Sequence, residues 1–173
     1  MGRLILVLGA NNSGKSLYAE ALTARCAARR CYVATMDPQT EVNHRRIARH
    51  RRQRQGLGFQ TLELPVQVGC APVPPDSAVL LEDVSNLLSN VLFAQGGSCG
   101  QVFRDLCALR RRCAVLVAVS IHGLDPAAYQ GETAVYLRAL NSLNRRLAAQ
   151  AQTVILMRDR VPTPLKGELP YVE

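Results

Sequence analysis

Short unbroken runs of apolar residues alternate along the chain with longer segments in which apolar and polar residues are mixed. Apolar runs bounded by turn residues predict buried strands, and the mixed segments predict helices with one buried side. We predict strands over residues 4–8, 31–35, 58–64, 78–84, 114–120 and 154–158. We predict helices over residues 16–28, 86–94, 101–112 and 132–151, and another helix that starts after residue 37.

Two of these helices can be described more closely. In the segment 16–28, Leu17, Ala21 and Ala24 fall on one side of the predicted helix. The helix after residue 37 begins at "DPQT", where Asp37 suits the capping position and Pro38 suits the first helical position. Beyond residue 158 we expect only a short tail.

Strands and helices alternate throughout, which is typical of a parallel sheet with helices on its faces. The sequence contains no repeat and no linker, and 173 residues are enough for one domain with its own core. We therefore predict a single α/β domain over residues 1–173.

The segment "GANNSGKS" at residues 9–16 matches the phosphate-binding pattern G-x-x-x-x-G-K-[ST], between a predicted strand and a predicted helix. Its glycines permit a tight curl that points backbone N–H groups at phosphate oxygens. Lys15 can reach the β- and γ-phosphates, and the Ser16 hydroxyl can bind Mg²⁺. The predicted nucleotide-contacting residues of this loop are Gly9, Ala10, Asn11, Asn12, Ser13, Gly14, Lys15 and Ser16. The fold class becomes an α/β P-loop, RecA-like, three-layer fold with a mainly parallel sheet.

A second strand ends in two acidic residues, Glu82 and Asp83. P-loop proteins commonly place a carboxylate from another strand near Mg²⁺, and either residue can serve. An Asn-Lys-x-Asp element is absent from the sequence, which argues against a switch GTPase.

Positive charge is concentrated in the predicted helix after residue 37. The net charge is +8, and residues 41–54 hold six arginines and one glutamate. We expect an anionic partner to meet this stretch. It also contains two of the three histidines, His44 and His50, which lie about 240° apart around a helix and so face different directions.

Cysteine spacing and hydropathy indicate the cellular location of the protein. None of the six cysteines forms a Cys-x-x-Cys pair, which favours reduced thiols. The run "LILVL" is too short for a secretory signal, and no apolar run approaches the roughly 20 residues of a membrane span. We expect a cytoplasmic protein without a membrane span.

Several segments together resemble one enzyme family. "GANNSGKS" is followed by "RRIARHRRQRQGLGFQTLE", "LLEDVSNLLSNVLF" and "PLKG". In content and order these are similar to the bifunctional adenosylcobinamide kinases/adenosylcobinamide-phosphate guanylyltransferases of cobalamin biosynthesis. The resemblance covers nearly the whole chain.

The resemblance implies a function, substrates and an assembly. Such enzymes phosphorylate adenosylcobinamide and then transfer GMP from GTP to its phosphate through a guanylyl-histidine. ATP and GTP are the expected nucleotide substrates, Mg²⁺ the expected cofactor, and a homotrimer the expected assembly.

The resemblance also implies roles for individual residues. The motif Arg-Ile-x-x-His-Arg falls on residues 46–51 and makes His50 the expected nucleophile. Lys15 of the phosphate loop is the other expected catalytic residue. Ser16 and Glu82 are the expected metal ligands. The expected nucleotide contacts beyond the phosphate loop are Thr35, Met36, Asp37, Arg51, Arg52, Gln53, Arg54, Glu63 and Glu82.

General chemistry is consistent with this role for His50. An attacking imidazole must be neutral. In a helix Arg46 and Arg54 lie one turn on either side of His50, and nearby positive charge lowers a histidine pKa.

The chain departs from the family pattern at several positions. Ala10 occupies a position that is often glycine, and Gln152 one that is often aspartate. Where the family usually has Asn-Glu-Val, this chain has Ser120, Ile121 and His122. Whether both half-reactions are retained therefore stays open at this point.

Two other functions remain open on the sequence. One is a divergent P-loop kinase or NTPase that acts on another small molecule without a covalent intermediate. The other is a nucleic-acid-binding ATPase, which we disfavour because no aromatic residue interleaves with the arginines for base stacking.

Overall fold

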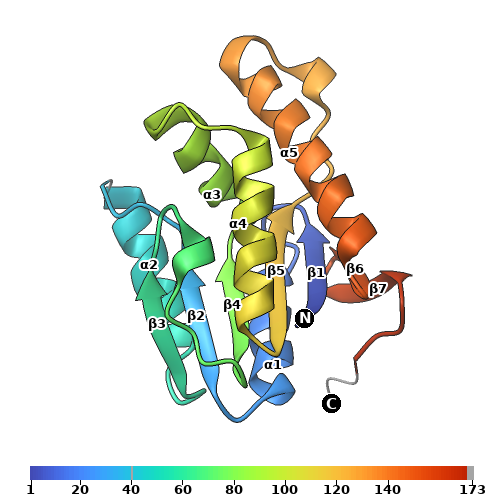
Figure 1. Ribbon diagram of the computed structural model, residues 1–173. Coiled ribbons are helices and arrows are strands. Elements are labelled where there is room, and N and C mark those ends of the chain that lie inside the picture. The colour runs from blue at the N-terminus through green and yellow to red at the C-terminus, as the bar shows by residue number, and fades with distance from the viewer. Residues whose placement is uncertain (40, 171–173) are drawn as a thin grey trace.

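The computed structural model describes residues 1–39 and 41–170, and a twisted sheet forms its centre (Figure 1). The strand order is β3-β2-β4-β5-β1-β6-β7. Six strands pair in parallel, and β7 runs antiparallel to β6 at one edge. The strands are β1 (Arg3–Gly9), β2 (Arg30–Ala34), β3 (Phe59–Glu63), β4 (Ala78–Glu82), β5 (Val115–Ile121), β6 (Thr153–Arg158) and β7 (Val161–Lys166).

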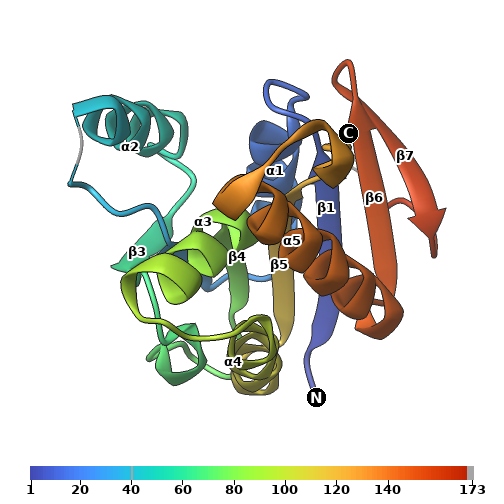
Figure 2. The ribbon, with the colours of Figure 1, turned by 90° about the horizontal axis from the view of Figure 1, so that it is seen from above.

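Helices cover the two faces of the sheet. Figure 2 shows α1 and α2 on one side of the strands and α4 on the other, and the core contacts place α3 and α5 with α4. The α-helices are α1 (Lys15–Cys26), α2 (Glu41–Gln53), α3 (Val84–Ser89), α4 (Cys99–Arg112) and α5 (Gly131–Gln150). A π-helical turn, Asn90–Ala94, extends α3, and short 3₁₀ turns occur at Val68–Cys70 and Pro126–Ala128. In the described residues, no helix combines the length and apolar character needed to cross a membrane.

The core has two parts because successive strand residues point to opposite faces of the sheet. In β1, Leu4, Leu6 and Leu8 pack with residues of α3, α4 and α5. Ile5 and Val7 pack on the other face with Ala19 and Leu22 of α1. The strands are thus buried on both sides, which explains their unbroken apolar sequences.

The predicted α/β fold and its mainly parallel sheet are confirmed, as are all six predicted strands, to within a few residues. The predicted side of α1 is wrong. Leu17 is 59% exposed, and the buried side carries Ala19, Glu20, Leu22 and Thr23 instead.

The predicted start of α2 is also wrong. The helix begins at Glu41, beyond Asp37 and Pro38. The Asp37 carboxylate accepts a hydrogen bond from the Gln39 backbone N–H, which holds a local turn before the helix. Residue 40, which precedes the helix, lies outside the described residues.

Strand β7 occurs where we expected only a tail. It contains Pro162 and Pro164, which argue against a strand in sequence-based reasoning. Proline is tolerated here because β7 lies at the edge of the sheet.

Candidate active site

The phosphate loop connects β1 to α1 and has the expected backbone form. Gly14 has φ of 85°, a left-handed conformation that favours glycine. A Cβ on Gly9 would clash with the Ser13 hydroxyl and lie 3.1 Å from the Met157 carbonyl oxygen, so this position also favours glycine. The Lys15 Nζ donates a hydrogen bond to the Ala10 carbonyl at 3.0 Å. The lysine is thereby held across the loop, beside the N-terminus of α1.

A cavity of about 720 Å³ opens above this loop, between the C-terminal ends of the strands and α2. Its volume suits a nucleotide. Of the residues predicted from the sequence, those that line it are Asn11, Asn12, Ser13, Gly14, Lys15, Ser16, Met36, His50, Arg51, Gln53, Arg54, Glu63 and Glu82.

Five predicted residues do not line the cavity: Gly9, Ala10, Thr35, Asp37 and Arg52. Gly9 and Ala10 form the base of the phosphate loop. Thr35 is fully buried, and its hydroxyl bonds to the backbone N–H and C=O of residue 83. Thr35 therefore fixes the chain after β4 and offers no side-chain surface to the cavity.

Side-chain oxygen atoms from α1, β2 and β4 meet at the cavity. The Ser16 hydroxyl donates a hydrogen bond to Glu82, and the Tyr32 hydroxyl donates to the other Glu82 oxygen at 3.1 Å. Asp83 instead accepts the Asn86 backbone N–H at 2.7 Å and so caps α3. Of the acidic pair, Glu82 is thus the residue in direct contact with the phosphate loop.

The oxygen atoms of Ser16 and Glu82 suit a hard divalent cation as ligands. Mg²⁺ prefers oxygen ligands, and a hydroxyl and a carboxylate lie together beside the phosphate loop. Burial raises the pKa of Glu82, while the Ser16 and Tyr32 hydrogen bonds lower it. A cation bound here would further favour the charged carboxylate.

His50 projects from α2 into this same space. Its side chain is 16% exposed, and its Nδ1 lies 4.0 Å from the Glu82 Oε1 and 4.0 Å from the Glu20 Oε1. His44 is exposed and does not line the cavity. The prediction that the two histidines face different directions is confirmed.

The surroundings of His50 keep its imidazole neutral. Burial is the main cause of a pKa lowered to about 4. The charged groups that lower this pKa further are, in decreasing order, Arg49, Arg54, Arg46 and Lys15. The predicted effect of Arg46 and Arg54 is confirmed, although burial outweighs both.

The arginines of residues 51–54 have different environments. Arg51 pairs with Glu63, and both side chains are more than half exposed. Arg54 is 6% exposed, and its guanidinium lies 3.3 Å from the centre of the Tyr32 ring. Its Nη1 is buried without a hydrogen-bond partner in the described residues. Arg54 thus presents an unused donor beside the nucleotide space.

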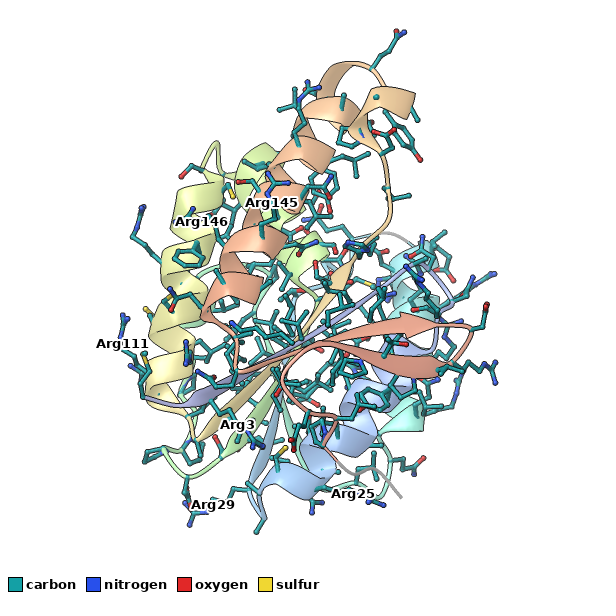
Figure 3. All side chains as sticks on the ribbon, turned by 90° about the vertical axis from the view of Figure 1, so that its right-hand side faces the viewer. Arg3, Arg25, Arg29, Arg111, Arg145 and Arg146 are labelled. Carbon is teal, nitrogen blue, oxygen red and sulfur yellow. The ribbon has the colours of Figure 1, made fainter. Side chains whose placement is uncertain are left out.

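Arginine is also common elsewhere on the protein. Figure 3 shows further arginines on or beside elements other than α2, namely Arg3, Arg25, Arg29, Arg111, Arg145 and Arg146. What distinguishes the arginines of α2 is therefore that this helix lies over the cavity.

Arg160 and Glu20 are among the residues at the site that sequence reasoning missed. Arg160, in the turn between β6 and β7, lines the cavity, and its N–H bonds to the Ser13 carbonyl. Glu20, in the second turn of α1, is 1% exposed and lies behind His50. A signal existed for Glu20, because the helical position one turn after Ser16 points to the same side as the phosphate loop's hydroxyl.

The positions that depart from the family pattern have structural partners here. The Ser120 hydroxyl bonds to Asn144 at 2.7 Å, and the Gln152 side chain accepts from the Leu4 N–H and from Arg110. Ile121 lines the cavity and offers no polar side chain to it. The site thus keeps the phosphate loop and His50 but is less polar at the β5 end.

Comparison with known proteins identifies the family of this chain. A family model described as cobinamide kinase / cobinamide phosphate guanyltransferase matches residues 5–165. A curated relative, the bifunctional adenosylcobalamin biosynthesis protein CobU of Salmonella typhimurium, is 28% identical over 187 aligned positions, which cover 94% of this chain and 99% of the relative. The match includes the phosphate loop, α2 and Glu82, and the chain belongs to the cobinamide kinase / cobinamide phosphate guanyltransferase family.

Proposed function

We propose that this enzyme phosphorylates adenosylcobinamide and then guanylylates the product through a covalent guanylyl-histidine on His50, as a step of cobalamin biosynthesis. The family match supports the pair of activities. One observation carries the covalent step: His50 lies in the same cavity as the phosphate loop, with its Nδ1 4.0 Å from the carboxylate that accepts the Ser16 hydroxyl.

In the first half-reaction, an adenosylcobinamide hydroxyl oxygen bonds to the γ-phosphorus of a nucleoside triphosphate. The bond from that phosphorus to the β-phosphate oxygen breaks, the hydroxyl proton is released, and the diphosphate leaves. Lys15 and the N–H groups at the start of α1 would hold the phosphates in line. Ser16 and Glu82 would hold Mg²⁺, which offsets phosphate charge when bound.

In the second half-reaction, an imidazole nitrogen of His50 bonds to the α-phosphorus of GTP and pyrophosphate leaves. A phosphate oxygen of adenosylcobinamide phosphate then attacks the same phosphorus. The nitrogen–phosphorus bond breaks, and a new diphosphate bond joins GMP to the corrinoid. A pKa of about 4 supports this role, because His50 carries an available lone pair at neutral pH.

The test is incubation with [α-³²P]GTP, followed by denaturation. We expect a protein label that acid removes and base does not, and that adenosylcobinamide phosphate discharges. His50→Asn should abolish the label. His44→Asn is the matched control, because His44 lies on the exposed side of the same helix and should label normally.

Normal labelling of His50→Asn would show that another residue is the nucleophile. Nucleotide-dependent phosphorylation without any protein label would instead favour a P-loop kinase that has no covalent intermediate.

A further inference from the structure

Glu20 is an anomaly in the middle of α1. Its side chain is 1% exposed, yet neither carboxylate oxygen has a hydrogen-bond partner within the described residues. Burial of an unpaired carboxylate costs stability, so such a group is retained where it has a use. Nothing in the chemistry described so far uses it.

The nearest candidate partner is the proposed nucleophile. The Glu20 Oε1 lies 4.0 Å from the His50 Nδ1, and this Nδ1 is itself buried and unpartnered in the described part of the chain. A hydrogen bond needs about 3 Å, so a shift of about 1 Å would join the two groups. The Glu20 carboxylate and the His50 Nδ1 face each other without partners, which points to a hydrogen bond between them in the active enzyme.

Glu82 is a weaker candidate for the same role. Its Oε1 also lies 4.0 Å from the His50 Nδ1, but that oxygen already accepts the Ser16 hydroxyl. Its other oxygen accepts the Tyr32 hydroxyl. Glu20 is therefore the carboxylate with acceptor capacity to spare.

The position of the imidazole proton decides which nitrogen can attack. A neutral imidazole carries one N–H and one lone pair. A carboxylate that accepts the Nδ1–H fixes that tautomer and leaves the lone pair on Nε2, as carboxylates do for catalytic and metal-binding histidines.

We propose that Glu20 is a positioning residue, whose buried carboxylate accepts a hydrogen bond from the Nδ1–H of His50 and thereby directs Nε2 at the α-phosphorus of GTP. This inference rests on the proposed guanylyl-histidine. Glu20 touches neither substrate nor the reacting atoms and acts through His50.

A bound metal is the competing explanation of the cluster. Ligand atoms of Glu20, His50 and Glu82 all lie within 4.8 Å of one another, and such a set also suits a divalent ion such as Zn²⁺. A metal on Nδ1 would leave the ring proton on Nε2 and remove the attacking lone pair. The proton, and not a metal, is therefore compatible with the nucleophile.

The first test measures the rate of protein labelling by [α-³²P]GTP in rapid-quench experiments. Glu20→Gln keeps an acceptor oxygen but not the charge, and Glu20→Met removes the acceptor at similar volume. We expect the rate to fall about tenfold in Glu20→Gln and about a hundredfold or more in Glu20→Met. Far-UV circular dichroism and urea unfolding of both variants report correct folding.

The second test reads the tautomer directly by ¹⁵N NMR of histidine-labelled protein, with His50→Asn used to assign the signal. We expect the Nδ1–H form in the wild-type protein and its loss in Glu20→Met. An Nε2–H form in the wild-type protein, or wild-type labelling rates in Glu20→Met, would overturn the proposal. So would labelling that depends on one equivalent of added Zn²⁺ bound at Glu20.

These two tests separate failure of this proposal from failure of the proposed function. Absence of any label on the wild-type protein refutes the guanylyl-histidine. The NMR signal still reports whether Glu20 and His50 are bonded.

Discussion

Arg54 and Arg110 are almost equally buried, at 6% and 5% exposure, but their surroundings differ. Arg110 in α4 donates to the Gly2 carbonyl, the Gln150 carbonyl and the Gln152 side chain. Arg54 lies against the Tyr32 ring and keeps a buried Nη1 without a partner in the described residues. One guanidinium is fully used to join parts of the fold, whereas the other keeps a free donor.

The difference extends beyond these two arginines. Among the described residues, the buried polar side-chain atoms without partners belong to Ser13, Glu20, His50 and Arg54. Three of these residues line the nucleotide-sized cavity, and Glu20 lies directly behind His50. Buried polar groups are normally satisfied, so their concentration here marks the place that a ligand completes.

The largest effect is expected from Arg110→Met. It removes the arginine donor from the Gly2 and Gln150 carbonyls and one of the two donors to the Gln152 side chain, which keeps the Leu4 N–H. We expect it to lower the free energy of unfolding by about 3 kcal/mol. Urea unfolding at pH 7.5 measures this. A loss below about 1 kcal/mol would mean that Arg110 is no more structural than Arg54.

Removal of the Glu20 charge should raise the free energy of unfolding, in contrast to Arg110→Met. Burial, followed by the charge of Glu82, raises the pKa of Glu20 from 4.5 to about 7. The folded state therefore holds this proton more tightly than the unfolded state, and Glu20 costs stability as pH rises from 4.5 through 7. Glu20→Gln should match the wild type near pH 4.5 and be more stable by about 2–3 kcal/mol at pH 8.

Unfolding curves of both proteins across that pH range give the difference, in which the contribution of His50 largely cancels. A difference independent of pH would show that Glu20 is already paired in the folded protein. If Glu20→Gln is more stable and is also labelled more slowly, the wild-type protein gives up stability for activity at this position.

Arg54→Met should weaken nucleotide binding more than folding. We expect the Kd for GTP to rise about tenfold to a hundredfold, and the free energy of unfolding to change by less than about 1 kcal/mol. Calorimetric titration with GTP measures the first. Unchanged affinity would refute the view that the unpartnered Nη1 is kept for a phosphate or base.

The smallest effect is expected at Arg45, which serves as the control on α2. Arg45 pairs with Glu41 at 3.4 Å, and both side chains are about four-fifths exposed. Arg45→Ala should change the free energy of unfolding by less than about 0.5 kcal/mol and leave the Kd for GTP unaltered. A large loss of affinity would show that general positive charge, and not the placement of Arg54, attracts the nucleotide.

The sequence predicted what depends on local pattern. Strands that are buried on both faces of the sheet appear in the sequence as continuous apolar runs. The phosphate loop is recognised by the fixed positions of its glycines and its lysine, which its backbone conformation requires. The family resemblance predicted His50 over His44, and the structure brings His50 to the cavity.

What sequence reasoning missed depends on tertiary context. Glu20 looks like a surface residue of an amphipathic helix until α2 covers it. Arg160 reaches the cavity through a hairpin that its prolines argue against. The turn at Asp37 forms from a side-chain contact that competes with capping. The homotrimer, the cytoplasmic location and bound Mg²⁺ stay predictions.

Pro162 and Pro164 have a consequence for how copies of this protein can meet. They lie in β7, the outermost strand of the sheet, and prolines in such strands place their missing N–H groups on the open side. A strand of another molecule would find few donors there, so the sheet cannot readily continue from one copy into the next. An assembly that uses this edge of the sheet must therefore be held by side-chain packing rather than by a strand that continues from one copy into the next.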